Sequence, residues 1–223
     1  MYISKKTMVY YIGLLFAFFG LSIITYLVVE DGLHLMLGWN LFLAFIPFIL
    51  VYILDRRKIK SKAINIILLL MWLFLFPNSI YVMTDLIYIN YSDFMINGGP
   101  YSDLLYLQNL EAYLALFHII IGLIIGLIYG LKSIDTLYKY CKESNFSKYK
   151  DLLVVGVFSL SSVGIYIGRF FRYNSWDIIK VWNIISDFFS TLSWFTVFFI
   201  FFMTVIQLLL FYSIRKIQTK KSN

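Results

Sequence analysis

The sequence AINIILLLMWLFLFPNSIYVMTDLIYIN, residues 63–90, decides the fold of this chain. Its first half is a nearly unbroken apolar run, which Pro77 interrupts before the chain continues to Asn90. A proline removes one backbone hydrogen bond, and Asp85 adds a carboxylate eight residues later, so both are costly in lipid. We therefore expect neighbouring helices to supply polar partners to this stretch.

The whole chain has the composition of a membrane protein. Of its 223 residues, 61% are apolar and 20% are aromatic, and the mean hydropathy is +0.81. Soluble domains are only about 45–50% apolar. Runs of roughly 20 apolar residues recur and leave no room for a separate soluble domain. We expect a single transmembrane helical domain over residues 1–223.

The predicted fold class is all-α, a polytopic membrane protein with six transmembrane helices and a short outer interfacial amphipathic helix. The first three spans are expected at about 8–29, 36–54 and 63–76, the third continuing beyond Pro77. The other three are expected at about 111–131, 152–168 and 192–212.

Two further helical segments are predicted on the outer side. After Ser175, polar residues recur at helical spacing between apolar ones, which indicates an amphipathic helix lying in the membrane interface. Near Asp103, with Ser102 as a candidate N-cap, the fourth helix is expected to begin before its membrane span.

The distribution of charge predicts the orientation. The loops on the side of the two termini hold 16 of the 19 basic residues, and the opposite loops hold eight of the 12 acidic residues. This is the positive-inside pattern, so both termini are predicted in the cytoplasm. Because the basic residues lie in short loops between spans, the net charge of +7 does not indicate nucleic acid as a partner.

Polar residues from four spans are predicted to gather in the outer third of the membrane. Counting about 1.5 Å per helical residue places Asn40, Asp85, His118 and Arg169 in this layer. The inner half of the membrane is expected to be almost purely apolar, which argues against a transporter. Gly122, Gly126 and Gly130 are spaced by four residues and predict close helix packing.

Two interpretations of these residues remain open. In the first, Asp85 and His118 are catalytic acid or base groups; the substrate-binding candidates are Asn40, Asn78, Arg169, Arg172, Asn174 and Trp176. In the second, Asp85 only pairs with Arg169 or Arg172, and the polar layer holds the helices together.

Metal and cofactor signals are missing from the sequence. The histidines are only His34 and His118, which excludes a histidine-rich metal site, and no metal is predicted. The lone Cys141, placed in a lysine-rich cytoplasmic loop, provides neither a disulfide within the chain nor a thiolate zinc site. No motif identifies a cofactor, and its nature stays unknown.

Three motifs resemble the bacterial integral membrane family known only as domain of unknown function 1361. They are GWNLFLAFIP at 38–47, WLFLFPNSIYVMTDL at 72–86 and GIYIGRFFRYNSWD at 164–177, and the resemblance covers about residues 35–212. Ile80 and Tyr173 depart from the proline and tryptophan expected there. The resemblance implies a bacterial multi-pass membrane protein and transfers no catalytic residue.

Function is therefore predicted at the level of class. The first hypothesis is binding or processing of an anionic lipid or lipid-linked substrate at the outer polar layer of the bacterial cell membrane. The alternative is a structural or accessory membrane protein that partners another membrane complex, and a transporter ranks below both. Whether the chain is an enzyme stays open, as does the identity of any protein partner.

Overall fold

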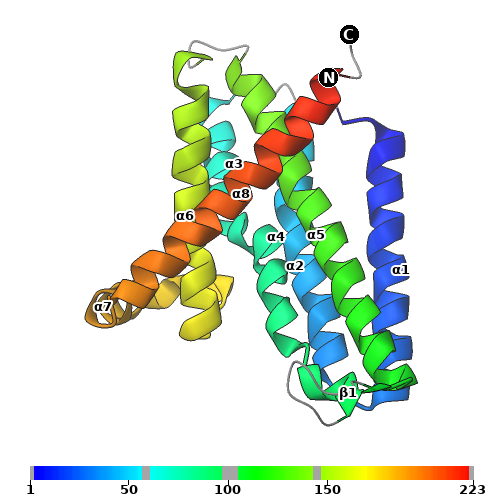
Figure 1. The fold of residues 1–223 in the computed structure, drawn as a ribbon. Helices are drawn as coiled ribbons and strands as arrows, with labels where there is room; N and C mark the ends of the chain where they lie inside the picture. The colour runs from blue at the N-terminus through cyan, green and yellow to red at the C-terminus, as the bar shows by residue number, and fades with distance from the viewer. Residues whose placement is uncertain (1–2, 57–60, 97–104, 143–146, 221–223) are drawn as a thin grey trace.

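The described residues of the chain form six long helices, as the sequence predicted (Figure 1). The computed structural model describes residues 3–56, 61–96, 105–142 and 147–220. The long helices are α1 (Lys5–Val29), α2 (Leu33–Arg56), α3 (Lys62–Leu75), α5 (Leu110–Lys142), α6 (Lys150–Phe170) and α8 (Trp194–Lys220).

The shorter elements lie between these helices. They are α4 (Pro77–Tyr81), the 3₁₀ helices η1 (Val82–Tyr88), η2 (Tyr91–Asp93), η3 (Ser147–Tyr149) and η4 (Ser175–Lys180), and α7 (Val181–Ser190). Two residues in each of β1 (Met95–Ile96) and β2 (Leu105–Tyr106) pair antiparallel.

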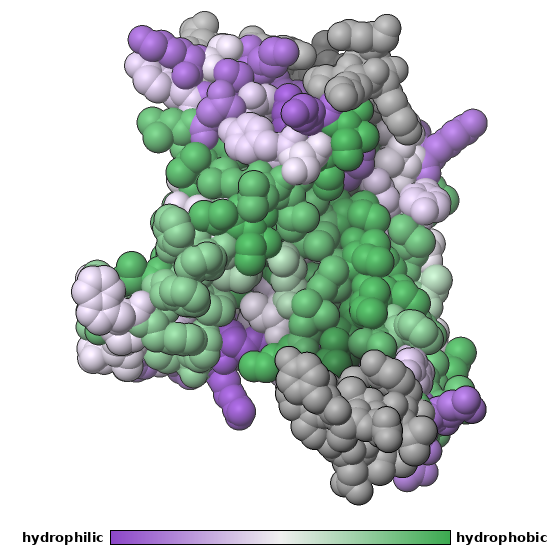
Figure 2. Space-filling model, in the orientation of Figure 1, coloured by the Kyte–Doolittle hydropathy of each residue, from purple (hydrophilic) through white to green (hydrophobic). Residues whose placement is uncertain are grey.

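The surface is that of a multi-pass membrane protein. Six helical stretches, the third running from α3 through η1, are long and apolar enough to cross a membrane. An apolar band separates the hydrophilic groups at the two ends of the molecule (Figure 2). We call the end that carries both chain termini the terminal end and the opposite one the far end (Figure 1).

The third span breaks at Pro77, as expected. The backbone N–H of Phe76 still bonds to the Trp72 carbonyl, at 2.7 Å, and Pro77 then begins α4. The Ser79 hydroxyl donates to the Ala44 carbonyl of α2, at 2.7 Å, and fixes the bend to its neighbour. A Cβ on Gly164 would lie 2.8 Å from Cγ of Pro77, so α6 approaches the bend closely.

The glycine face of α5 is confirmed as a close-packing surface. A Cβ added to Gly122 would lie 2.7 Å from the Phe18 ring, and one on Gly126 would lie 2.5 Å from Val82. Real Cβ atoms do not make such contacts, so glycine is what lets α5 reach both α1 and η1. This packing places η1 within the bundle.

Three expectations were wrong in detail. The fourth helix begins at Leu110, capped by the Asn109 side chain, and not near Asp103, because β2 precedes it. The Ser102 cap lies outside the described residues. Cys141 belongs to the last turn of α5 rather than to a loop, because that helix continues past its membrane span.

The half of the bundle near the terminal end is not purely apolar, which is the third correction. Ser133, Asp135 and Gln207 are buried there. Helices α5 and α8 run beyond their predicted ends at 131 and 212, so they bring charged residues into contact that the sequence reading had assigned to loops.

Candidate functional site

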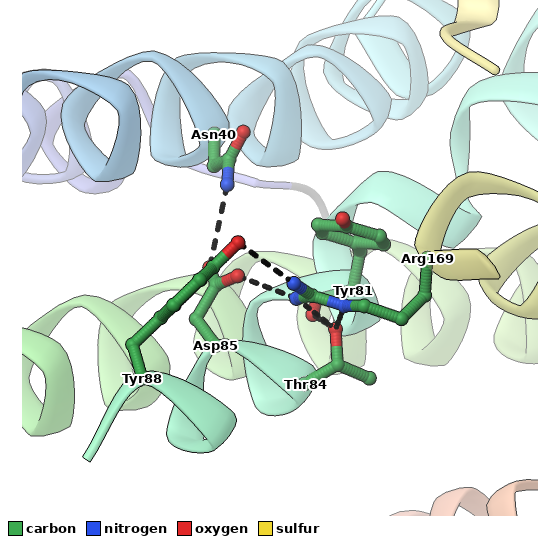
Figure 3. Close-up of polar contacts among 6 residues, drawn as sticks. All are labelled: Asn40, Tyr81, Thr84, Asp85, Tyr88 and Arg169. Carbon is green, nitrogen blue, oxygen red and sulfur yellow. Dashed lines mark hydrogen bonds and ion pairs between the residues drawn. The ribbon is translucent and has the colours of Figure 1, made fainter. Parts of the chain in front are cut away.

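The η1 helix prepares the site through its tight winding. A 3₁₀ helix has three residues per turn, so side chains three positions apart lie one above the other. Tyr81, just before η1, therefore aligns with Thr84, and Asp85 aligns with Tyr88. These two adjacent rows of polar side chains face α6, where Arg169 lies between them (Figure 3).

Arg169 uses every nitrogen of its guanidinium group. Nε donates to the Thr84 hydroxyl at 2.9 Å, and Nη1 donates to the Tyr88 hydroxyl at 3.0 Å. Nη2 donates to Oδ1 of Asp85 at 2.6 Å and also contacts the Thr84 hydroxyl. The guanidinium carbon lies 4.4 Å from the centre of the Tyr81 ring, within the range of cation–π attraction.

Asp85 joins a third helix to this pair. Its Oδ2 accepts from Nδ2 of Asn40 on α2, at 3.4 Å, while Oδ1 accepts from Arg169 (Figure 3). The exposed fractions of the Asp85 and Arg169 side chains are only 3% and 10%. We call these residues the Asp85–Arg169 lock, because they connect α2, η1 and α6 in a nearly water-free place.

His118 belongs to a separate buried cluster at the far end. Its Nδ1 lies 2.9 Å from Nδ1 of His34 on α2, and its Nε2 lies 2.9 Å from the Ser22 hydroxyl on α1. The Phe18 ring stacks on it at 4.6 Å. Both histidines are fully buried.

Hydrogen bonding in this histidine cluster assigns the tautomers. The Ser22 hydroxyl donates to the Phe18 carbonyl at 2.9 Å, so it accepts from Nε2–H of His118. Nδ1 of His118 then carries no proton and accepts from Nδ1–H of His34. The chain of donors therefore runs in one direction, from α2 through α5 to α1.

The remaining candidates lie outside the lock. Asn78 is half-buried in α4, and Trp176 belongs to η4. Arg172 and Asn174 are exposed just after α6, and Arg172 has a left-handed backbone with φ 59°. Of the predicted site residues, the structure thus brings Asn40, Asp85 and Arg169 into contact.

The segment after α6 is stabilised by its own acidic groups. The backbone N–H of Asn174 donates to Asp177 at 2.8 Å, which together with nearby Lys180 lowers the pKa of that carboxyl. The Tyr173 hydroxyl donates to Asp187 at 2.7 Å, which raises the pKa of the phenol. These bonds fix the positions of η4 and α7 relative to the end of α6.

Sequence reasoning missed partners that carry no charge. Ser22 and His34 were not assigned to a site, although His34 lies six residues before Asn40 on α2, about 9 Å along the helix. Thr84 and Tyr88 were not named as ligands of an arginine either. The three-residue spacings after Pro77, from Tyr81 to Thr84 and from Asp85 to Tyr88, were the signal that would have found them.

No cluster in the described ranges offers the three or more His, Cys, Asp or Glu side chains that a metal site requires. The polar groups of the lock form hydrogen bonds and an ion pair with one another.

Comparison with known proteins identifies the family. The sequence pattern of proteins of unknown function called DUF1361 matches residues 39–210, which confirms the resemblance in the three motifs. No curated protein and no solved structure gives a significant match. Because the match extends from α2 to α8 and includes every residue of the lock, this chain belongs to the DUF1361 family.

Proposed function

We propose that this protein lies in the bacterial cell membrane with both termini in the cytoplasm and binds the anionic group of a lipid or lipid-linked molecule at its outer, far end. The excess of basic residues at the terminal end supports this orientation. Substrate recognition then falls to the exposed residues beyond the lock, with Arg172 as the principal contact.

Arg169 is a poor candidate for holding a headgroup itself. Its nitrogens already bond to three side chains, and 10% of the side chain is exposed. An incoming phosphate would have to displace Asp85, which would leave a buried carboxylate without its cation. The lock therefore serves as a frame that fixes the end of α6.

The backbone of Arg172 is the observation that carries the proposal. A residue other than glycine in the left-handed region costs about 1–2 kcal/mol, and this one sits where a helix C-terminus commonly has glycine. Its side chain is exposed, and no residue of the described chain forms an ion pair with it. The strained position leaves an exposed guanidinium group without an ion-pair partner among the described residues at the far end, where it can donate hydrogen bonds to a phosphate or carboxylate.

The test compares two basic residues at the same end. Wild type, Arg172→Gln and Lys180→Gln are reconstituted in nanodiscs containing phosphatidylglycerol and phosphatidylcholine, and the lipids that stay bound after detergent extraction are measured by mass spectrometry. We expect Arg172→Gln to lose most of the preference for phosphatidylglycerol. Lys180→Gln should keep it, since Lys180 pairs with Asp177 at 3.5 Å. An unchanged preference in Arg172→Gln would contradict the proposal.

The orientation has its own test. In a Cys141→Ser background, a cysteine in place of Gly32 should react with a membrane-impermeant maleimide on intact cells, because the α1–α2 turn lies at the far end (Figure 1). A cysteine in place of Lys142 should react only after the cells are opened. The reverse pattern would place the far end in the cytoplasm.

A second candidate function is that of an accessory protein for another membrane complex. The observation that favours it is the complete set of partners around Arg169, which suits a purely structural layer. In that case Arg172→Gln retains every lipid preference and every cellular phenotype, while Asp85 variants lose both stability and function. The buried polar groups near the terminal end also remove the argument that ranked a transporter below these two.

A further inference from the structure

A cleft of about 280 Å³ lies between α5 and α8 towards the terminal end. Its walls are aliphatic and aromatic, with Ile124, Ile128 and Leu131 on α5 facing Leu210 and Ile214 on α8. The two helices cross near the terminal end and diverge towards the far end (Figure 1). The cleft therefore lies where the angle between them leaves a space that their side chains do not fill.

The cleft is long and narrow. Its α5 residues extend from Ile124 to Asp135, a length of roughly 16 Å along the helix. Sites for drug-sized ligands are commonly about 300–1,000 Å³, so this volume suits only part of a lipid. The volume is too small to enclose a second helix, which is about 10 Å wide, and suits a single acyl chain.

Charged side chains occupy only one end of the cleft. Lys132, Asp135 and Arg215 line it there, next to Lys139. Asp135 pairs with Arg215 at 2.5 Å and with Lys139 at 2.5 Å, and Arg215 stacks on Tyr138 at 3.9 Å. Three cations thus surround one carboxylate.

Lys132 is the cation left over at this rim. Its side chain is exposed, and the described part of the chain gives its ammonium group no ion pair or hydrogen bond. Another carboxylate of the described residues at this end, Asp151, pairs with Lys150 at 3.1 Å and accepts from two tyrosine hydroxyls. It is therefore not available to neutralise Lys132.

We propose that this cleft binds an anionic phospholipid from the leaflet at the terminal end, with one acyl chain between α5 and α8 and the phosphate at Lys132. The apolar walls suit the acyl chain of such a lipid, and the cationic rim suits its phosphate. The rim lies nearer the terminal end than the walls, as the phosphate of a lipid in that leaflet does. Basic pockets between transmembrane helices on the cytoplasmic side are a common form of anionic lipid site. The site is separate from the far-end arginine and does not depend on it.

Photo-crosslinking tests the proposal directly. The full-length protein in nanodiscs is irradiated with phosphatidylglycerol or phosphatidylcholine that carries a diazirine in one acyl chain, and the labelled peptides are mapped. We expect phosphatidylglycerol to label residues 124–135 and 210–215 more strongly than phosphatidylcholine does. Lys132→Gln should lower this preference about fivefold and leave phosphatidylcholine labelling unchanged.

Two neighbouring substitutions provide a matched control for the cleft itself. Leu210 lines the cleft, whereas Leu209 is 63% exposed on the lipid-facing side of the same helix. Leu210→Trp should abolish labelling in the cleft by both lipids, and Leu209→Trp should not. Thermal unfolding shows whether each variant is folded. If Leu210→Trp does not fold, Lys132→Gln still tests the proposal, because that substitution lies at the exposed rim.

Three results would overturn the proposal. They are equal labelling by the two lipids, an unchanged preference in Lys132→Gln, and equal effects of the two tryptophan substitutions. A fourth would be a disulfide crosslink between two copies of a Leu210→Cys variant, since the occupant of the cleft would then be protein.

Discussion

The two ends of the bundle each join an aspartate and an arginine across helices, but to different effect. At the far end, Asp85 and Arg169 are 3% and 10% exposed, and Tyr81 lies under the guanidinium group. At the terminal end, Asp135 and Arg215 are 11% and 19% exposed, with Tyr138 in the same role. We call the second pair the Asp135–Arg215 bridge.

The difference lies in what surrounds each pair. The lock is closed, since neutral hydroxyl and amide groups complete the hydrogen bonding of both partners. The bridge is open, because Lys139 shares its carboxylate and a cleft begins beside it. The same two residue types thus form a fully enclosed pair at one end and a pair with an additional cation beside a cleft at the other.

Removing the carboxylate from each pair should give the largest contrast. Asp85→Ala leaves the Arg169 guanidinium buried without its anion, which costs about 3–5 kcal/mol. Asp135→Ala should cost less than this, because the side chains of Arg215 and Lys139 are 19% and 40% exposed and can reach water. Thermal or denaturant unfolding of the two variants in detergent measures the difference, and equal losses would show that the two pairs are equivalent.

Close packing behind the lock should have the next largest effect. Gly126→Ala places a Cβ 2.5 Å from Val82 in η1, and overpacking of this kind costs about 1–3 kcal/mol. Gly156→Ala on α6 is the control, since no atom lies within 4 Å of its added Cβ. The control should be neutral or slightly stabilising, and an equal loss in both would mean that η1 does not depend on α5.

The histidine cluster should show a loss of similar size at the same end. His118→Leu leaves the buried Nδ1–H of His34 without an acceptor, at a cost of about 1–3 kcal/mol. Replacing both histidines by leucine should recover part of it, because no orphaned donor remains. Nitrogen NMR of the wild type should report protons on Nδ1 of His34 and Nε2 of His118, and the opposite tautomers would refute the assigned direction.

The sequence predicted the far end better than the terminal end. Asp85, Arg169 and Asn40 lie inside or at the edge of apolar spans. A polar side chain is energetically costly there, so these residues stand out in the sequence, and the Pro77 break indicates their depth in the membrane. Asp135 and Arg215 follow the predicted ends of their spans and looked like solvated loop residues. Only the lengths of α5 and α8, which depend on tertiary contacts, bring them together.

The histidine cluster was hidden for another reason. His34 lies at the start of α2 and His118 inside α5, 84 positions apart, and no periodicity connects them. Their contact follows from the packing of α5 against α2, two helices that run in the same direction. Packing of this kind is not encoded in any local pattern of residues.

A double-mutant cycle on Asp85 and Arg169 tests the lock most directly. Unfolding free energies in detergent are compared for Asp85→Ala, Arg169→Met and the double variant. If the pair is a closed structural lock, the double variant is more stable than Asp85→Ala alone, with a coupling energy on the order of 2 kcal/mol. Losses that simply add, to within about 0.5 kcal/mol, would show that the two side chains do not hold the helices together.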